Sequence, residues 1–147
     1  MEILGAEFTI KEIEILETPS FSTTATFSTL SPIHIDIVRE NGERRDLFPT
    51  DPEWRQRIEE NSRKKYFQYF QREYKGPFEI MEIHWMKTKR ITIRDSKWRA
   101  ANMKFTMRAE PDMLRFLWNA GIGSKNSQGF GCLKYEGVLV TSNNKSS

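Results

Sequence analysis

The apolar residues of this chain change their spacing several times, and the order of the changes restricts the fold more than any other feature. Alternation at every second residue indicates a strand with one buried face, whereas spacing at three to four residues indicates an amphipathic helix. From residue 25 onward we expect six elements: strand 25–38, a helix from Asp51 to Gly76, strand 78–94, strand 96–109, a helix from Pro111 to Gly121, and strand 129–140.

This order of strand, helix, strand, strand, helix, strand is the split βαβ repeat of ferredoxin-like domains. It predicts an α+β fold in which a four-stranded antiparallel sheet carries both helices on one face and leaves the other face free. Residues 3–16 alternate as well and predict an extra N-terminal strand. We therefore divide the chain into an N-terminal strand and linker (1–23), a ferredoxin-like domain (24–140) and a disordered tail (141–147).

Local signals refine two of these elements. Thr50 and Glu53 have the spacing of a capping box, which would start the first helix, and Gly76-Pro77 would end it. Pro32 has no N–H to donate to a neighbouring strand, so we expect it at an edge or a bulge of strand 25–38. The polar segment 39–46, which contains Asn41-Gly42, predicts a turn or loop.

Composition excludes several classes of protein. One cysteine cannot form an intrachain disulfide, and with two histidines it cannot complete a zinc site, so we expect no metal and no cofactor. No apolar run reaches the roughly 18–20 residues that span a bilayer, and the first residues lack the pattern of a signal peptide. These observations predict a cytoplasmic protein without a membrane partner.

The net charge of +3 conceals a strong asymmetry along the chain. Residues 1–53 carry four basic and eleven acidic side chains, a net charge of −7, while residues 54–147 carry nineteen and nine, a net charge of +10. The second stretch is therefore a candidate for binding a polyanion such as a nucleic acid. The alternative is a lysine-rich surface that only keeps the protein solvated.

Basic residues concentrate in the two adjacent strands 78–94 and 96–109. We expect this hairpin to extend past the sheet as a twisted arm that contacts RNA, with Trp85 and Trp98 as stacking platforms for unpaired bases. The alternative is an exposed edge hairpin that its charges protect from aggregation. The candidate RNA-binding residues of this hairpin are Lys87, Lys89, Arg90, Arg94, Lys97 and Arg99.

Four glycines and several small polar residues follow the second helix in the segment GIGSKNSQGFG (121–131). Glycines permit positive φ angles and close backbone approach, so consecutive N–H groups can point at one anion. The alternative is a connector between a helix end and a strand. The candidate RNA-binding residues here are Gly121, Gly123, Ser124, Lys125, Asn126, Ser127, Gly129 and Gly131.

This segment resembles the glycine-rich signature of the RAMP superfamily, in particular that of the CRISPR-associated endoribonucleases that cut precursor CRISPR RNA within its repeats. Ser31-Pro32-Ile33 and Phe48-Pro49-x-x-Pro52 fit the same family, and the resemblance covers roughly residues 24–140. It implies that this domain is the second of two ferredoxin-like halves. It also implies metal-independent cleavage through attack of the 2′-hydroxyl, with catalytic groups in the first half.

The resemblance implies repeat RNA as a partner, together with an N-terminal domain if this chain is a fragment, and it leaves a homodimer open. His34 and His84 are weak catalytic candidates, because both fall in the strand phase that faces the open side of the sheet. We favour the alternative of two solvent-facing histidines. Three hypotheses remain: an RNA-binding domain that does not cut, a chain that cleaves RNA by itself, and an interaction module.

Overall fold

The computed structural model describes residues 19–137, so the expected strand 3–16 and tail 141–147 lie outside the described residues. Within this range, no helix is both long and apolar enough to cross a membrane. The elements are β1 (Thr24–Thr29), β2 (Asp36–Val38), β3 (Arg44–Asp46), α2 (Trp54–Phe70), β4 (Phe78–Ile93), β5 (Ser96–Ala109), α3 (Pro111–Ala120), a 3-10 turn (Asn126–Gln128) and β6 (Leu133–Gly137).

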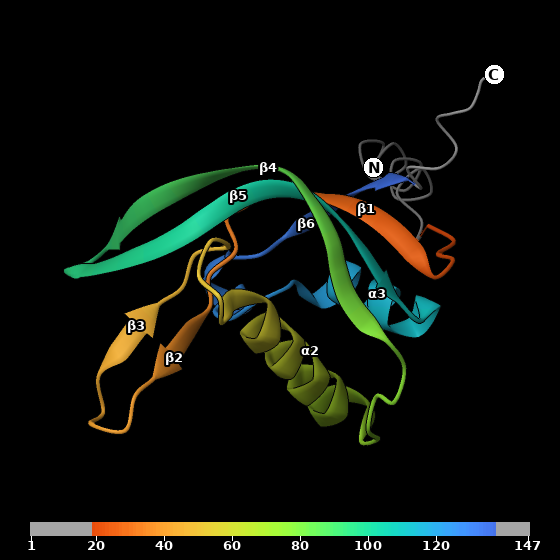
Figure 1. Cartoon of the computed structure of the whole chain (residues 1–147), viewed down its shortest axis with the longest axis horizontal. Helices are drawn as coiled ribbons and strands as arrows, with labels where there is room; N and C mark the ends of the chain where they lie inside the picture. Colours follow the sequence, from red (N-terminus) through yellow and green to blue (C-terminus); the bar gives the residue numbers. More distant parts are fainter. Residues whose placement is uncertain (1–18, 138–147) are drawn as a thin grey trace, which may run out of the picture.

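The main sheet has four strands in the order β4-β5-β1-β6, with antiparallel pairing throughout. Helices α2 and α3 lie on the same side of this sheet (Figure 1). This is the ferredoxin-like α+β arrangement that the spacing of apolar residues predicts, so the predicted fold class is confirmed.

Alternation along the central strands builds the core between the sheet and the helices. Ala25 is paired with Met107 and Phe27 with Phe105, and all four side chains are fully buried. Helix α2 adds Trp54 and Ile58, while α3 adds its four buried residues. The intervening residues of β1 and β5 lie on the opposite face of the sheet, as the two-residue period of a strand requires.

Strand 25–38 was predicted as one element, and this prediction is wrong. Strand β1 ends at Thr29, the chain bends at residues 30–31, and Ile33 then pairs with Ala101 of β5 through an isolated bridge. Pro32 lies in this break between strands rather than at an edge or a bulge of one strand, and its carbonyl oxygen accepts a hydrogen bond from the N–H of Gly131. Strand β2 begins three residues after Ile33, at Asp36.

The predicted loop 39–46 is also partly a strand. Strand β2 pairs with β3 in a two-stranded sheet, and the pairing includes Ile37 with Arg45 and Val38 with Arg44. Gly42, with a φ of +87°, lies in the turn between the strands. This β2–β3 hairpin projects beside the main sheet, below the long β4–β5 hairpin (Figure 1).

Helix α2 is shorter than the sequence predicts at both ends. It begins at Trp54, and the carboxylate of Asp51 accepts hydrogen bonds from the N–H of Phe48 and from Arg45 instead of opening the helix. No side-chain cap forms at Glu53, so the predicted capping box is wrong. The helix ends at Phe70 because Gln71 takes a left-handed conformation with a φ of +59°.

The prediction that the β4–β5 hairpin extends past the main sheet is confirmed. Strand β1 pairs with β5 only as far as Lys104, whereas β4 and β5 stay paired from Lys87 and Asn102 to the turn at Arg94 and Asp95. We call this extension, residues 87–102, the arm. It is a long curved ribbon that reaches over the β2–β3 hairpin (Figure 1).

Candidate functional site

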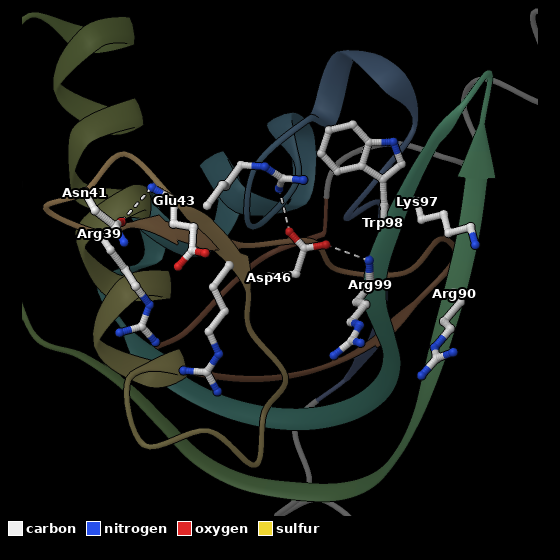
Figure 2. A pocket seen from close by; sticks show the side chains of 10 residues that line it. Arg39, Asn41, Glu43, Asp46, Arg90, Lys97, Trp98 and Arg99 are labelled. Carbon is white, nitrogen blue, oxygen red and sulfur yellow. Dashed lines mark hydrogen bonds and ion pairs between the residues drawn. The ribbon is translucent and has the colours of Figure 1, made fainter.

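A groove of about 820 Å³ opens between the arm and the β2–β3 hairpin (Figure 2). Three of the residues predicted to contact RNA, Arg90, Lys97 and Arg99, lie on its arm side. Its other wall comes from the β2–β3 hairpin, where the sequence predicts a loop (39–46). We call it the basic groove, and its lining residues are Arg39, Asn41, Glu43, Arg44, Arg45, Asp46, Arg90, Lys97, Trp98 and Arg99.

The three arginines of the β2–β3 hairpin are functional candidates that sequence reasoning missed. They lie in the N-terminal stretch whose net charge is −7, and summing charge over that stretch concealed them. The segment RENGERRD itself contains all three, and its Asn-Gly turn is a hairpin signal that could have revealed them.

Ion pairs divide the cations of the basic groove into two groups. Arg44 contacts the carboxylates of Asp36 at 2.8 Å and Asp46 at 2.5 Å, and Arg45 contacts Asp51 at 2.8 Å. Within residues 19–137, no carboxylate lies in ion-pair range of the other four: Arg39, Arg90, Lys97 and Arg99. These four exposed cations give the groove a positive potential that favours a polyanion.

The remaining basic candidates of the arm lie outside the groove. Lys87 and Lys89 are exposed on β4, and Arg94 is exposed at the turn of the arm. They extend the positive surface along the ribbon without lining the groove.

The two tryptophans of the hairpin have different surroundings. The ring of Trp98 is covered by two cations, with the Arg44 guanidinium and the Lys125 ammonium each 4.4 Å from its centroid. The faces of Trp98 are therefore engaged by protein groups, contrary to its expected role as an open stacking platform. Trp85 is 48% exposed, and its position opposite Lys104 places it on the face of the sheet away from the helices.

The glycine-rich segment is folded tightly against the start of β2. Gly123 and Gly131 have φ angles of +78° and +76°, and an added Cβ would lie 2.5 Å from the His34 carbonyl oxygen or 1.9 Å from that of Ile122. Gly121 and Gly129 also have positive φ angles, so all four glycines of the segment adopt conformations that other residues rarely take. These glycines permit a close backbone approach that other residues would hinder.

Most N–H groups of this segment donate to protein oxygens rather than pointing at an open anion site. The N–H groups of Ile122, Ser124 and Gly131 donate to the carbonyl oxygens of Gly131, His34 and Pro32, and those of residues 128–130 close the 3-10 turn. The side-chain amide of Asn126 donates to two further carbonyls of the segment. The surface side chains of the segment left to contact a ligand are those of Lys125, Ser127 and Gln128.

Lys65 of α2 holds this segment from below and was not singled out from the sequence. Its ammonium donates to the carbonyl oxygens of Gly121 at 3.0 Å and Gly123 at 2.8 Å, and to the side-chain oxygen of Asn126 at 2.7 Å. Burial lowers the pKa of Lys65 to about 8. The helix thus fixes the loop that presents Lys125.

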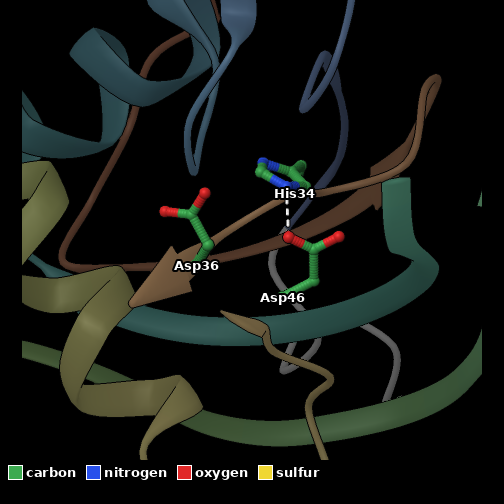
Figure 3. A group of neighbouring side chains, drawn as sticks. All are labelled: His34, Asp36 and Asp46. Atoms are coloured by element: carbon green, nitrogen blue, oxygen red, sulfur yellow. Dashed lines mark hydrogen bonds and ion pairs between the residues drawn. The ribbon is translucent and has the colours of Figure 1, made fainter. Parts of the chain in front are cut away.

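His34 is fully buried and does not face the open side of the sheet, so that expectation is wrong. Its Nδ1 lies 2.7 Å from the Ser124 hydroxyl and its Nε2 lies 3.1 Å from the Asp46 carboxylate (Figure 3). The ring also packs against Trp98 and Phe130. Burial lowers the pKa of His34, which favours the neutral ring.

The carboxylates beside His34 already have a cation between them. One ligand atom each from His34, Asp36 and Asp46 lie within 4.8 Å of one another (Figure 3), a spacing that a metal ion could use. However, Arg44 donates to both carboxylates and the N–H of Arg99 donates to Asp46. A metal ion would have to displace this guanidinium, so the arrangement favours a structural ion-pair network.

His84 occupies the open face of the sheet, where the sequence predicts it. Its Nε2 lies 2.7 Å from the Thr106 hydroxyl, which is in turn 2.8 Å from the hydroxyl of Thr26, and Glu82 lies 3.4 Å from its Nδ1. His34 and His84 have different hydrogen-bonding partners, and the structure does not bring them together as an acid–base pair.

Comparison with known proteins agrees with the fold. A relative from Pyrococcus furiosus, named CRISPR-associated endoribonuclease Cas6, is 34% identical over 135 residues, which cover 91% of this chain and 50% of the relative. Another from Methanocaldococcus jannaschii, CRISPR-associated endoribonuclease Cas6 1, is 28% identical and covers 89% of this chain and 52% of the relative. The chain thus spans about half the length of these curated relatives.

Solved structures with a similar fold also match this chain over about half of their own length. One, described as a Cas6-related gene product from Pyrococcus furiosus, has a TM-score of 0.75 and 27% identity over 81% of this chain and 50% of the other. A second, described as an RAMP protein binding different RNA substrates, has a TM-score of 0.70 and 26% identity over 81% and 51%. The family model described as CRISPR associated protein Cas6, C-terminal, matches residues 16–135, and the chain belongs to this family.

Proposed function

We propose that this chain is the RNA-binding domain of an endoribonuclease that processes precursor CRISPR RNA within its repeats. The cut would follow the metal-independent 2′-hydroxyl route, with the catalytic groups supplied by an N-terminal ferredoxin-like domain of the same protein, in the cytoplasm. Residues 24–140 would supply affinity and register. A homodimer is a further assembly compatible with this role.

The observation that carries the proposal is the basic groove beside the glycine-rich segment. Four cations without ion pairs in the described part of the chain, Arg39, Arg90, Lys97 and Arg99, line one hollow from two hairpins. These cations would displace the counterions condensed on the RNA phosphates, and this release contributes a large share of the affinity of proteins for nucleic acids. Lys125 extends the positive surface from the groove toward the glycine-rich segment.

The other predicted contacts fit the same path. Lys87, Lys89 and Arg94 would follow the RNA backbone along the arm, and Ser127 would meet it at the glycine-rich segment. Trp85 offers an exposed indole on which an unpaired base can stack. Gly121, Gly123, Asn126, Gly129 and Gly131 would act by shaping the segment, because most of its N–H groups and the Asn126 amide donate to protein oxygens.

Cleavage by this chain alone has weaker support. Both ring nitrogens of His34 have protein partners and its ring is buried, so a general acid or base role would require it to leave that network. His84 remains the candidate with access from the open sheet face. Incubating the chain with labelled repeat RNA in EDTA tests this alternative, and cutting that disappears in His84→Ala would favour it.

RNA binding is tested by titrating labelled repeat RNA at 50 to 200 mM salt. Five or six phosphate contacts, each contributing a log–log slope of about −0.7, predict an affinity loss of roughly two orders of magnitude over this range. The double variant Arg90→Gln/Arg99→Gln should reduce the slope by about 1.4. The matched control is Lys64→Gln/Lys75→Gln, which removes two exposed charges away from the groove and should leave the slope unchanged.

A flat salt response would contradict the proposal, as would equal loss of affinity in the groove and control variants. In either case the interaction-module hypothesis would be favoured, with the arm kept basic for solubility.

A further inference from the structure

Lys125 holds a backbone conformation that its residue type rarely adopts. Its φ is +60°, in the left-handed region, whereas the other positive φ angles of the glycine-rich segment belong to glycines. A residue with a Cβ is strained in this region, so its surroundings must hold it there, and such strain is concentrated at functional positions. A glycine would relieve the strain but would also remove the ammonium group, so the strain indicates that the side chain has a role.

The ammonium group of Lys125 is held beside the basic groove without an ion pair. It lies 4.4 Å from the centroid of the Trp98 ring, which belongs to the wall of the groove. Within residues 19–137, no carboxylate lies in ion-pair range of this ammonium. Its charge therefore remains available to a phosphate.

The residue before Lys125 is clamped by His34. The Ser124 hydroxyl lies 2.7 Å from the Nδ1 and 3.1 Å from the carbonyl oxygen of His34, and the N–H of Ser124 donates to the same carbonyl at 2.7 Å. On the other side of the ring, Nε2 lies 3.1 Å from Asp46, whose second carboxylate oxygen accepts a hydrogen bond from the N–H of Arg99 at 2.8 Å (Figure 3). His34 thus links the glycine-rich segment to β3 and, through Asp46, to the arm.

On the basis of the RNA-binding function proposed above, we infer that His34 is a positioning residue for RNA. It holds Ser124 so that Lys125 presents its ammonium at a fixed place beside the basic groove. The side chain of His34 has no exposed surface, so it cannot touch RNA itself and can affect binding only through its neighbours. Fixing the cation in advance lowers the entropy cost of ordering it when a phosphate binds.

A double-variant cycle separates this role from a contribution to stability alone. If His34 only stabilised the fold, the loss of His34 and the loss of Lys125 would weaken RNA binding by independent factors. If His34 acts through Lys125, removal of the ammonium has little further effect once the clamp is gone.

The experiment measures dissociation constants for labelled repeat RNA by fluorescence anisotropy. His34→Gln keeps an amide near the position of Nε2, within reach of Asp46, but removes the group that contacts Ser124. Lys125→Ala is made in the wild type and in His34→Gln. Lys89→Ala, which removes an exposed cation of the arm outside this network, is made in the same two backgrounds as the matched control. Melting temperatures establish that each protein is folded.

We expect Lys125→Ala to weaken RNA binding about fivefold in the wild type and less than about twofold in His34→Gln. Lys89→Ala should weaken binding by the same factor in both backgrounds. His34→Asn, whose shorter amide lies near the position of Nδ1 and can contact Ser124, should restore most of the effect of Lys125→Ala.

An equal factor for Lys125→Ala in the wild type and in folded His34→Gln would overturn the inference and leave the proposed function standing. If His34→Gln does not fold, Ser124→Ala takes its place in the cycle, because it removes the hydroxyl side of the same contact. An equal factor for Lys125→Ala in that background would overturn the inference in the same way. Absence of RNA binding by the wild type would overturn both the inference and the proposed function.

Discussion

Gly131→Ala should be among the most damaging single-methyl changes in this chain, and its cost can be worked out from the structure. The residue has a φ of +76°, where an alanine costs roughly 1–2 kcal/mol. The new Cβ would lie 1.9 Å from the Ile122 carbonyl oxygen, a backbone atom that moves only with its segment. Moving it weakens two hydrogen bonds, from the Ile122 N–H to the Gly131 carbonyl and from the Gly131 N–H to the Pro32 carbonyl. Each contributes about 0.5–1.5 kcal/mol to stability.

These contributions sum to about 3 kcal/mol, which corresponds to a fall in melting temperature of roughly 10 °C for a domain of this size. Gly129→Ala is the matched control, because Gly129 has a φ of +96° but no atom within 4 Å of an added Cβ. This variant should lose only the stability that the positive φ angle costs an alanine, about 1 kcal/mol, which lowers the melting temperature by roughly 4 °C. Thermal unfolding followed by circular dichroism measures both. Equal melting temperatures for the two variants would refute the close packing of the segment against Pro32 and Ile122.

Further predictions concern the polar network around the same segment. Lys65 has a pKa of about 8 in the folded state and about 10.4 in the unfolded state, so as the pH rises it loses its proton at a lower pH when folded. Raising the pH from 7 to 10 should therefore stabilise the wild type relative to Lys65→Met in urea unfolding, and a parallel pH dependence would contradict the burial of this amine. Lys125→Ala should melt like the wild type, bind RNA more weakly, and reduce the salt slope by less than one unit in anisotropy titrations. His34→Ala removes the hydrogen-bonding partner of Ser124 and Asp46, so it should lower the free energy of unfolding by about 1–3 kcal/mol in the same urea assay. EDTA should leave the unfolding free energy of the wild type unchanged.

The fold was predictable because its main elements carry complete periodic patterns. Phe105 and Met107 alternate with polar residues along β5, and the buried residues of α2 recur every four positions. The arm was predictable because charged residues stand at the alternate strand positions that would face the core if the main sheet continued along the hairpin. Each of these patterns is local and repeats along the element, so it can be recognised in the sequence without knowing the tertiary contacts.

The errors come from contacts between segments far apart in the chain. The strand through Pro32 is interrupted because its carbonyl bonds to Gly131 and Ile33 pairs with Ala101, neither of which is visible in the local pattern. His34 alternates with apolar residues, as a solvent-facing strand residue would. In the structure it is buried, and Asp46 and Ser124 form hydrogen bonds with its two ring nitrogens. A two-residue period cannot distinguish a solvated polar side chain from one that is buried and paired.

The same limit explains which parts of the candidate site were missed. The basic groove requires the β2–β3 hairpin to lie against the arm, a contact made through the bond between the Arg99 N–H and Asp46. Lys65 reads as one more exposed lysine in a basic helix, and only the packing of α2 under the glycine-rich segment shows that it is bonded to three oxygens.

Photocrosslinking tests the central claim, that RNA lies in the basic groove and along the glycine-rich segment, more directly than any affinity measurement. Repeat RNA containing 4-thiouridine would be bound to the wild type, irradiated and digested, and the crosslinked peptides identified by mass spectrometry. We expect crosslinks within residues 39–45, 87–99 and 124–128. Crosslinks confined to the exposed surfaces of α2 and α3 would contradict it, because no residue of either helix lines the basic groove.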